Sequence, residues 1–448
     1  MEAAAHRGHR IDPNRCFSDD ILNLTFGCEV AFNAQTHHSQ STRVHSLLDV
    51  PGGQIASSSR PRASARQKAA AMDIINSAQL KVLSKHKYSV GGQSWLERVF
   101  LSPFCNILVE MFPRWLAPNV ITFIGALCFV VPGCYLVFHT PTATLSDDKM
   151  PGAFWLTLSV CCLAYQLLDC IDGKQARRTG NSSPLGEFLD HGIDAFATII
   201  LPLSAASCAL LGEVPLMHAM APVAAISLFF MAHWHSYVAG TMHVNSMVDV
   251  EEARTYFTML FILNGLHPMG RGFFLQEIAV VPWLPMPLTV RDLFFAIPAV
   301  FIVISFATCV LRCEGVIAQR PASERLELHA PLIQLVLWII PTLLTCVTSQ
   351  LFRSHPQLII STLGLVMVHL VHRLLVMNMC KSKVQPFHPI LAIPYVLFLN
   401  SVMLVTPEHS LFVFFLVAQL VYILIWSALV IRQLLTYLNI SLCTISSW

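Results

Sequence analysis

Charge is what this sequence has least of. Of its 448 residues, 28 are lysine or arginine and 26 are aspartate or glutamate, so charged residues make up 12%, where a soluble domain carries roughly 25%. Hydrophobic residues make up 55%, and the mean hydropathy is +0.60. So few charged residues cannot cover the surface of a soluble protein of this size, so the composition excludes a soluble globular protein. It predicts an all-α, polytopic bundle of membrane-spanning helices.

Two further features are missing. The formal net charge is only +2 and no basic face is apparent, so nucleic acid is not a predicted partner. None of the 14 cysteines forms a Cys-x-x-Cys pair, which argues against a zinc site. Most of the cysteines lie inside apolar segments, where we expect them to act as small hydrophobic residues rather than as a disulfide framework.

Three segments are predicted along the chain. Residues 1–80 mix serine, histidine, arginine and glycine in irregular order, which indicates a disordered tail. Residues 81–440 are expected to form the membrane domain, and residues 441–448 a short C-terminal tail. Within the domain, residues 94–112 intersperse apolar and charged side chains, which predicts a helix lying on the membrane surface. The alternative is an extension of the first span.

Long apolar runs predict the spans. The bilayer core needs about 20 apolar residues per helix. The sequence offers about ten such segments, at 118–138, 152–171, 187–211, 216–240, 254–267, 289–311, 331–351, 357–377, 387–405 and 410–432. The fifth is short and is flanked by polar residues.

Lysine and arginine near the span ends are unevenly distributed. With ten spans, one side carries Lys81, Lys85, Lys87, Arg98, Arg114, Lys174, Arg177, Arg178, Arg312, Arg320, Arg325, Lys381 and Lys383. The opposite side carries Lys149, Arg271, Arg291 and Arg353. Because positive residues accumulate on the cytosolic side of a membrane protein, the richer side is predicted to face the cytosol.

Four aspartates stand at the cytosolic ends of two consecutive apolar segments. Asp169 and Asp172 are three residues apart, and Asp190 and Asp194 are four apart, so each pair shares a helix face. Ionisable groups at membrane depth are costly and therefore indicate a functional site. A short loop at 178–185 would let all four carboxylates converge.

The residues that begin the second of these helices can also be predicted. Ser183 and Pro184 have the character of an N-cap and a first-turn proline. Four aspartates at close range could not all stay ionised without compensating charge. Hard divalent cations with oxygen ligands, such as Mg²⁺ or Mn²⁺, would supply that charge, and two ions could bridge a diphosphate. In the alternative reading, the aspartates cap helices and pair with Lys174, Arg177 and Arg178.

The spacing resembles a known family signature. The pattern D-x2-D-G-x2-A-R-x8-G-x3-D-x3-D, which runs from Asp169 to Asp194, is similar to that of the CDP-alcohol phosphotransferases. Segments 115–122, 182–192 and 233–238 resemble the choline/ethanolaminephosphotransferase branch, and the similarity covers about residues 81–440. One departure is Arg254, where the branch usually has glutamine. It lies near a possible headgroup region, so it bears on the choice of alcohol.

The resemblance implies a function. It implies a ten-helix membrane protein, often dimeric, in endoplasmic reticulum or Golgi membranes. It implies two Mg²⁺ or Mn²⁺ ions and transfer of phosphocholine or phosphoethanolamine from CDP-choline or CDP-ethanolamine to diacylglycerol, the final step of de novo phospholipid synthesis. It further implies metal ligation by Asp169, Asp172, Asp190 and Asp194. The implied CDP-alcohol contacts are Asn119, Gly173, Ala176, Arg177 and Gly186.

Two residues are candidates for the base that takes the diacylglycerol hydroxyl proton. Asp194 is the first candidate, because it corresponds to the aspartate proposed for that role in the family, although a metal ligand is a weak base. His233 is the second, because histidine titrates near neutral pH. The alternative for His233 is a polar residue that lines the bundle. His369 and His372 are expected to form a buried hydrogen-bonding pair rather than to act in catalysis.

Two other classes of function fit part of the pattern. A polytopic prenyltransferase also binds a diphosphate through Mg²⁺ and aspartate clusters, but it lacks the glycine, alanine and arginine spacing seen here. A non-catalytic transporter or scaffold would not need a complete metal and diphosphate motif, and no internal repeat supports a transporter.

Overall fold

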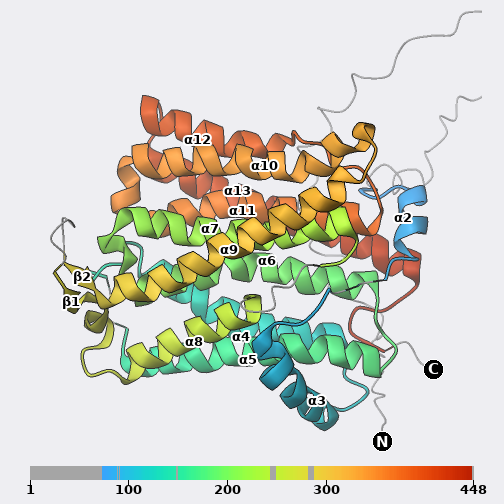
Figure 1. The fold of residues 1–448 in the computed structure, drawn as a ribbon, viewed down its shortest axis with the longest axis horizontal. Coiled ribbons are helices and arrows are strands. Elements are labelled where there is room, and N and C mark those ends of the chain that lie inside the picture. The colour runs from blue at the N-terminus through green and yellow to red at the C-terminus, as the bar shows by residue number, and fades with distance from the viewer. Residues whose placement is uncertain are drawn as a thin grey trace, which may run out of the picture. The chain divides into compact units, whose positions relative to one another are not determined.

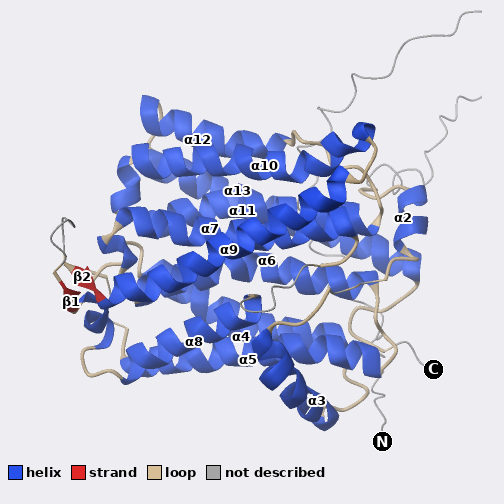
Figure 2. Ribbon diagram, viewed as in Figure 1, coloured by secondary structure: helices blue, strands red, loops and turns tan. Residues whose placement is uncertain are grey.

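The computed structural model describes residues 73–87, 89, 91–147, 150–242, 249–280 and 287–445. Within these residues the chain is almost entirely helical (Figure 2). The only strands described form a short antiparallel hairpin, in which β1 (Glu277–Ala279) pairs with β2 (Leu288–Thr289).

Eight helices in the described part of the chain are long and apolar enough to cross a membrane. They are α4 (Pro118–His139), α5 (Gly152–Arg178), α6 (Pro184–Cys208), α7 (Pro215–Ala239), α9 (Val290–Ala318), α10 (Ala322–Thr348), α11 (Pro356–Met379) and α13 (Glu408–Leu438). Two shorter helices, α8 (Val250–Leu266) and α12 (Ala392–Met403), occupy the fifth and ninth expected spans. The predicted all-α membrane bundle is confirmed, and the expected count of about ten spans is approximate.

Short elements connect and flank these helices. The first described helix, α2 (Ser77–Leu83), crosses the boundary expected at residue 80, and Leu80 is buried. Residues 1–72 of the expected tail lie outside the described residues. The π-helical turn η1 (Glu97–Leu101) and α3 (Ser102–Met111) cover most of the helix expected at 94–112; its place at the membrane surface stays a prediction. The remaining turns are η2 (Leu211–Glu213), η3 (Gly270–Leu275), η4 (Gln350–Arg353) and η5 (Pro389–Leu391).

Helix ends follow local chemistry. The side chain of Ser183 accepts a hydrogen bond from the Gly186 backbone N–H at 3.2 Å, and Pro184 occupies the first turn of α6, as predicted. Proline suits this position because it has a fixed φ and its missing N–H would be unpaired there. Since α5 continues to Arg178, the connection to α6 is residues 179–183, shorter than the expected loop at 178–185.

The helices differ in how deeply they are buried. In an 18-residue apolar stretch of each helix, 89% of α11 and 78% of α6 is buried, against 11% of α9 and 17% of α13. The long helices lie side by side, with α4, α5 and α8 in one group and α10 and α12 in another (Figure 1). The apolar surfaces of α9 and α13 are therefore available to lipid.

Candidate active site

Three of the four motif aspartates meet between α5 and α6. Asp169 lies in the second half of α5, while Asp190 and Asp194 lie in the first half of α6. Each offers one carboxylate oxygen, and these oxygens all lie within 4.8 Å of one another. The helical spacing predicted that Asp190 and Asp194 share one face of α6, and this face packs towards Asp169.

The sequence predicted that all four carboxylates converge, but the fourth aspartate, Asp172, is not part of this close group. Its side chain is buried in α5 and accepts a hydrogen bond from the hydroxyl of Thr122 on α4. The two helices pack against each other, so α4 fixes the Asp172 carboxylate. Its predicted role as a metal ligand stays a prediction.

A buried arginine joins two members of the group. Arg254 lies in the second turn of α8, which begins at Val250 and is capped by Asp249. One guanidinium nitrogen donates to Asp169, and the other donates to Asp194 at 2.6 Å. Arg254 is 3% exposed. The sequence singled out this residue as a departure from the branch but did not predict that it contacts the aspartates.

Other side chains complete the surroundings of Arg254. Its guanidinium carbon lies 4.7 Å from the centroid of the Tyr165 ring, and the Tyr165 hydroxyl donates to Asp194. The Glu251 carboxylate lies 3.5 Å from the guanidinium and accepts from Gln166 at 2.9 Å. Sequence reasoning missed Tyr165, although it stands one helical turn before Asp169.

The structure contradicts the alternative in which neighbouring cations pair with the aspartates. Lys174 donates to the Ser102 hydroxyl at 3.0 Å. Arg178 donates to the backbone carbonyls of Val109 and Phe112 instead. Arg177 is exposed and forms no salt bridge among the described residues. The positive charge at the aspartates therefore comes from α8, not from the end of α5.

Four of the five predicted CDP-alcohol contacts fall into two neighbouring pairs. A Cβ atom added at Gly186 would lie 3.6 Å from the Asn119 side-chain oxygen, and one at Gly173 would lie 3.6 Å from the Arg177 guanidinium. The Asn119 amide donates to the Leu442 carbonyl at 2.9 Å, which brings the C-terminal segment to the start of α4. Ala176 is half-buried, one turn after Gly173.

His233 is buried in the second half of α7. Its Nδ1 lies 2.9 Å from the Phe229 carbonyl oxygen. Because a carbonyl only accepts, Nδ1 carries the hydrogen and Nε2 keeps its lone pair. No described group hydrogen-bonds to that Nε2 atom. The His233 ring centroid lies 5.3 Å from that of His191, the neighbour of Asp190.

His369 and His372 are both buried, as expected, but they do not form the expected hydrogen bond to each other. Both rings are buried in α11. Nδ1 of His372 donates to the Val368 carbonyl, whereas neither ring nitrogen of His369 has a described partner. The two rings are therefore not hydrogen-bonded to each other. Each instead packs against Trp426 of α13.

The aspartate group is suited to a divalent cation. One carboxylate oxygen of Asp190 is buried and has no hydrogen-bond partner. A buried carboxylate oxygen without a partner is costly, and oxygen ligands are those that Mg²⁺ and Mn²⁺ prefer. The residues present therefore fit a metal ion.

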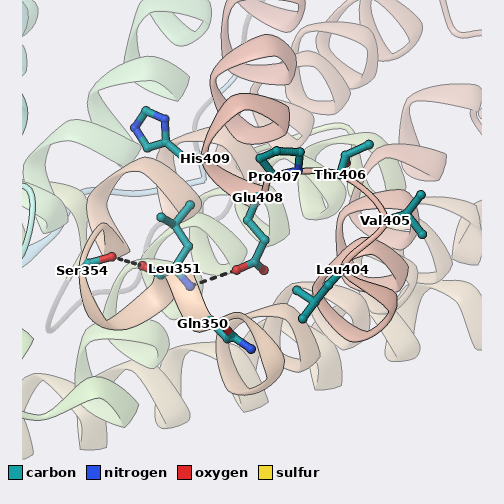
Figure 3. Close-up of a pocket in the computed structure, with 9 residues that line it drawn as sticks. All are labelled: Gln350, Leu351, Ser354, Leu404, Val405, Thr406, Pro407, Glu408 and His409. Carbon is teal, nitrogen blue, oxygen red and sulfur yellow. Dashed lines mark hydrogen bonds between the residues drawn. The ribbon is translucent and has the colours of Figure 1, made fainter.

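A separate cavity of about 550 Å³ opens between η4 and the start of α13 (Figure 3). Glu408 accepts from the Leu351 backbone N–H at 3.0 Å on its wall. The adjoining first turn of α11 contacts the far end of α6, where Gln357 donates to Ser207 at 2.7 Å. This cavity therefore lies at the opposite end of α6 from the aspartates and is not their binding cleft.

Comparison with known proteins agrees with this geometry. A sequence profile described as CDP-alcohol phosphatidyltransferase matches residues 115–290, which include all four aspartates. Cholinephosphotransferase 1 of Danio rerio is 31% identical over 381 residues, covering 83% of this chain and 96% of the relative. The chain belongs to the CDP-alcohol phosphatidyltransferase family. The predicted family and the predicted phosphotransferase activity are thereby confirmed.

Other members of the family give the same picture. Cholinephosphotransferase 1 of Xenopus laevis is 31% identical, with 83% of this chain and 91% of the relative covered. The Homo sapiens protein of that name is also 31% identical, with 73% and 79% covered. Members of the family use divalent metal ions, and the group of Asp169, Asp190 and Asp194 is able to hold one.

Proposed function

We propose that this chain transfers phosphocholine from CDP-choline to diacylglycerol and releases phosphatidylcholine and CMP. The observation that carries the proposal is the convergence of Asp169, Asp190 and Asp194 within the family motif. The choice of choline over ethanolamine is supported by the relatives, which bear the name cholinephosphotransferase 1.

The aspartates and their neighbours would bind the donor. Asp169, Asp172, Asp190 and Asp194 would hold one or two Mg²⁺ or Mn²⁺ ions, which supply neutralising charge for the diphosphate and the departing CMP. The exposed Arg177 would pair with a phosphate oxygen. Asn119 and the small residues Gly173, Ala176 and Gly186 would leave room for the nucleotide beside the backbone.

The reaction breaks the phosphoanhydride bond of the CDP-alcohol and forms a phosphoester bond to diacylglycerol. The diacylglycerol hydroxyl oxygen forms a bond to the phosphorus that carries choline, in line with the leaving group. The bond from that phosphorus to the bridging oxygen breaks, and CMP departs with the electron pair. The hydroxyl proton passes to a base on the protein.

His233 is the better supported base of the two candidates. The described contacts of Asp194 already commit its carboxylate to Arg254 and Tyr165, so it is a poor proton acceptor. Nε2 of His233 holds a lone pair and has no described partner. A positioned histidine typically contributes 10²- to 10⁴-fold to the rate of such a step.

The setting of the enzyme is part of the proposal. We place it in the endoplasmic reticulum or Golgi membrane, with the aspartates facing the cytosol, because CDP-alcohols are soluble and the motif end of the bundle carries most of the lysine and arginine. Diacylglycerol would enter from the bilayer, and the homodimer implied by the family resemblance is part of the proposal.

The test is transferase activity of the purified protein in lipid nanodiscs. We expect turnover of CDP-choline with diacylglycerol and Mg²⁺, slower turnover of CDP-ethanolamine, and none in excess EDTA. Asp190→Asn should reduce turnover by at least about 100-fold, since it removes a charged ligand whose loss costs several kcal/mol of transition-state stabilisation.

The matched control is Asp292→Asn, which changes a helix-capping aspartate of α9 outside the site and should leave the specific activity unchanged. Turnover that persists in EDTA would remove the metal mechanism. Asp190→Asn activity above a tenth of wild type, at equal folded amounts, would remove Asp190 from the site.

A further inference from the structure

We infer that Arg254 is a built-in counter-ion of the metal site. It holds Asp169 and Asp194 together when no ion is bound, and its charge limits how tightly a divalent ion binds. The inference rests on the metal site of the proposed function, and it concerns a residue that the family motif does not include.

Arg254 bridges two of the aspartates. Its two terminal nitrogens each donate to a different carboxylate, one to Asp169 on α5 and one to Asp194 on α6. A single side chain from α8 therefore connects the two helices that supply the metal ligands. This is the arrangement of a bridging cation, made by a planar guanidinium with donors in fixed directions.

The surroundings hold Arg254 in that position. The Tyr165 ring centroid lies 4.7 Å from the guanidinium carbon, at cation–π distance, and the Glu251 carboxylate lies 3.5 Å from one of the guanidinium nitrogens. Arg254 is 3% exposed, so water screens its charge weakly. The arginine is thus fixed in place and is not a solvent-exposed side chain that reaches the site occasionally.

The positive charge of Arg254 opposes the binding of a metal ion. Asp169, Asp190 and Asp194 bring three negative charges within 4.8 Å of one another, and Arg254 returns one positive charge to the group. A divalent ion that binds the remaining oxygens is repelled by that charge at ion-pair range. Removing the arginine should therefore strengthen metal binding while it weakens the metal-free fold.

These two effects have opposite signs, which separates the inference from a purely structural role. A residue that only braces the helices would, when removed, disorder the carboxylates and weaken both stability and metal binding. A counter-ion that competes with the metal would, when removed, lower stability without metal but raise metal affinity. Metal ions should then restore much of the lost stability, because ligands that bind only the folded state stabilise it.

The experiment measures Mn²⁺ binding and thermal unfolding of the full chain in detergent micelles. Free Mn²⁺ is followed by electron paramagnetic resonance, and the unfolding temperature is recorded in EDTA and in excess Mn²⁺. For Arg254→Gln we expect Mn²⁺ affinity at least about tenfold above wild type, a lower unfolding temperature in EDTA, and a smaller deficit in Mn²⁺.

Two control variants isolate the charge. Arg254→Lys keeps the positive charge, so its Mn²⁺ affinity should stay within about threefold of wild type. Arg291→Gln removes another arginine that is 3% exposed, one that donates to the Leu210 carbonyl away from the aspartates. It should lower the unfolding temperature but leave Mn²⁺ affinity unchanged.

The outcomes distinguish this inference from the proposed function. If Asp190→Asn binds Mn²⁺ as wild type does, the metal site itself is wrong. If Asp190→Asn loses binding while Arg254→Gln binds no more tightly than wild type, only the counter-ion inference is overturned. Should Arg254→Gln fail to fold in EDTA, recovery in Mn²⁺ supports the inference, and failure in both conditions overturns it.

Discussion

The four aspartates of the motif have four different sets of partners. Asp172 accepts from a neutral hydroxyl, that of Thr122. Asp169 and Asp194 share Arg254, while Asp190 keeps one buried oxygen without a hydrogen-bond partner. Substitutions at these positions should therefore differ in effect. Loss of the Asp190 charge removes a ligand, whereas loss of the Asp169 or Asp194 charge also leaves a buried arginine partly uncompensated.

The proposed base gives a prediction at the same scale. His233→Gln should lower kcat by about 100-fold or more, because glutamine cannot accept the hydroxyl proton. Mn²⁺ binding should be unchanged, since no described hydrogen bond or ion pair joins His233 to the aspartates. The measurements are steady-state transferase kinetics and Mn²⁺ titration of the folded protein.

His218 supplies the matched control for that prediction. It lies on the same helix, α7, is fully buried, and has no described hydrogen-bond partner at either ring nitrogen. It stands in the first turn, whereas His233 stands near the end of α7. His218→Gln should leave kcat per folded molecule unchanged. Equal losses in both variants would indicate damage to the helix and would contradict a proton-accepting role for His233.

At the scale of elements, α5 and α8 position Asp169 against Arg254. The two helices pack along their length, and at the end away from the aspartates two glycines make the contact. A Cβ atom added at Gly152 would lie 2.7 Å from the Gly265 carbonyl oxygen. Because that oxygen belongs to the backbone, it cannot rotate away. The glycines therefore permit the close approach of the two helices.

The Gly152→Ala variant tests that contact. We expect it to destabilise the fold by about 1–3 kcal/mol, the usual range for overpacking, seen as a lower unfolding temperature in micelles. Gly315→Ala is the control, because a Cβ atom there would meet nothing within 4 Å. In a helix interior alanine is favoured over glycine by up to about 1 kcal/mol, so this variant should be as stable as wild type or slightly more so. Equal unfolding temperatures for the two variants would contradict the close contact.

The same elements show what the sequence could and could not predict. Ser183 and Pro184 predict the start of α6, because capping depends on neighbouring residues. The spacing of the aspartates predicts which of them share a helix face, because that is a property of single helices. The bond from Arg254 to Asp169 joins residues 85 positions apart, so it depends on how α8 packs against α5. The contact from Thr122 to Asp172 likewise requires a third helix, which spacing within the motif does not reveal.

At the scale of the whole described bundle, contacts between distant segments define two ends. At the aspartate end, Asn119 meets Leu442, and Lys383 pairs with Glu327 at 2.6 Å. At the other end, Arg271 donates to the Ser207 carbonyl. Since consecutive helices run between these ends, the lysine- and arginine-rich connections predicted from sequence gather with the aspartates. That charge asymmetry carries the predicted orientation.

The orientation can be tested with single cysteines. Ser182 lies exposed in the connection between α5 and α6, and Ser354 lies exposed in the wall of the cavity at the opposite end. Each is changed to cysteine in a chain whose 14 native cysteines are replaced. In sealed, cytosol-side-out microsomes, an impermeant maleimide should label Ser182→Cys and should label Ser354→Cys only after detergent is added.

Transferase activity of both variants, measured before labelling, shows that the chain is inserted and folded. The expected pattern follows from where the substrates are: a charged CDP-alcohol cannot cross the bilayer, so the aspartates must open to the compartment that contains it. Labelling of Ser354→Cys but not Ser182→Cys in intact microsomes would reverse the orientation. Labelling of both without detergent, in vesicles shown to be sealed, would contradict the two-ended arrangement of the bundle.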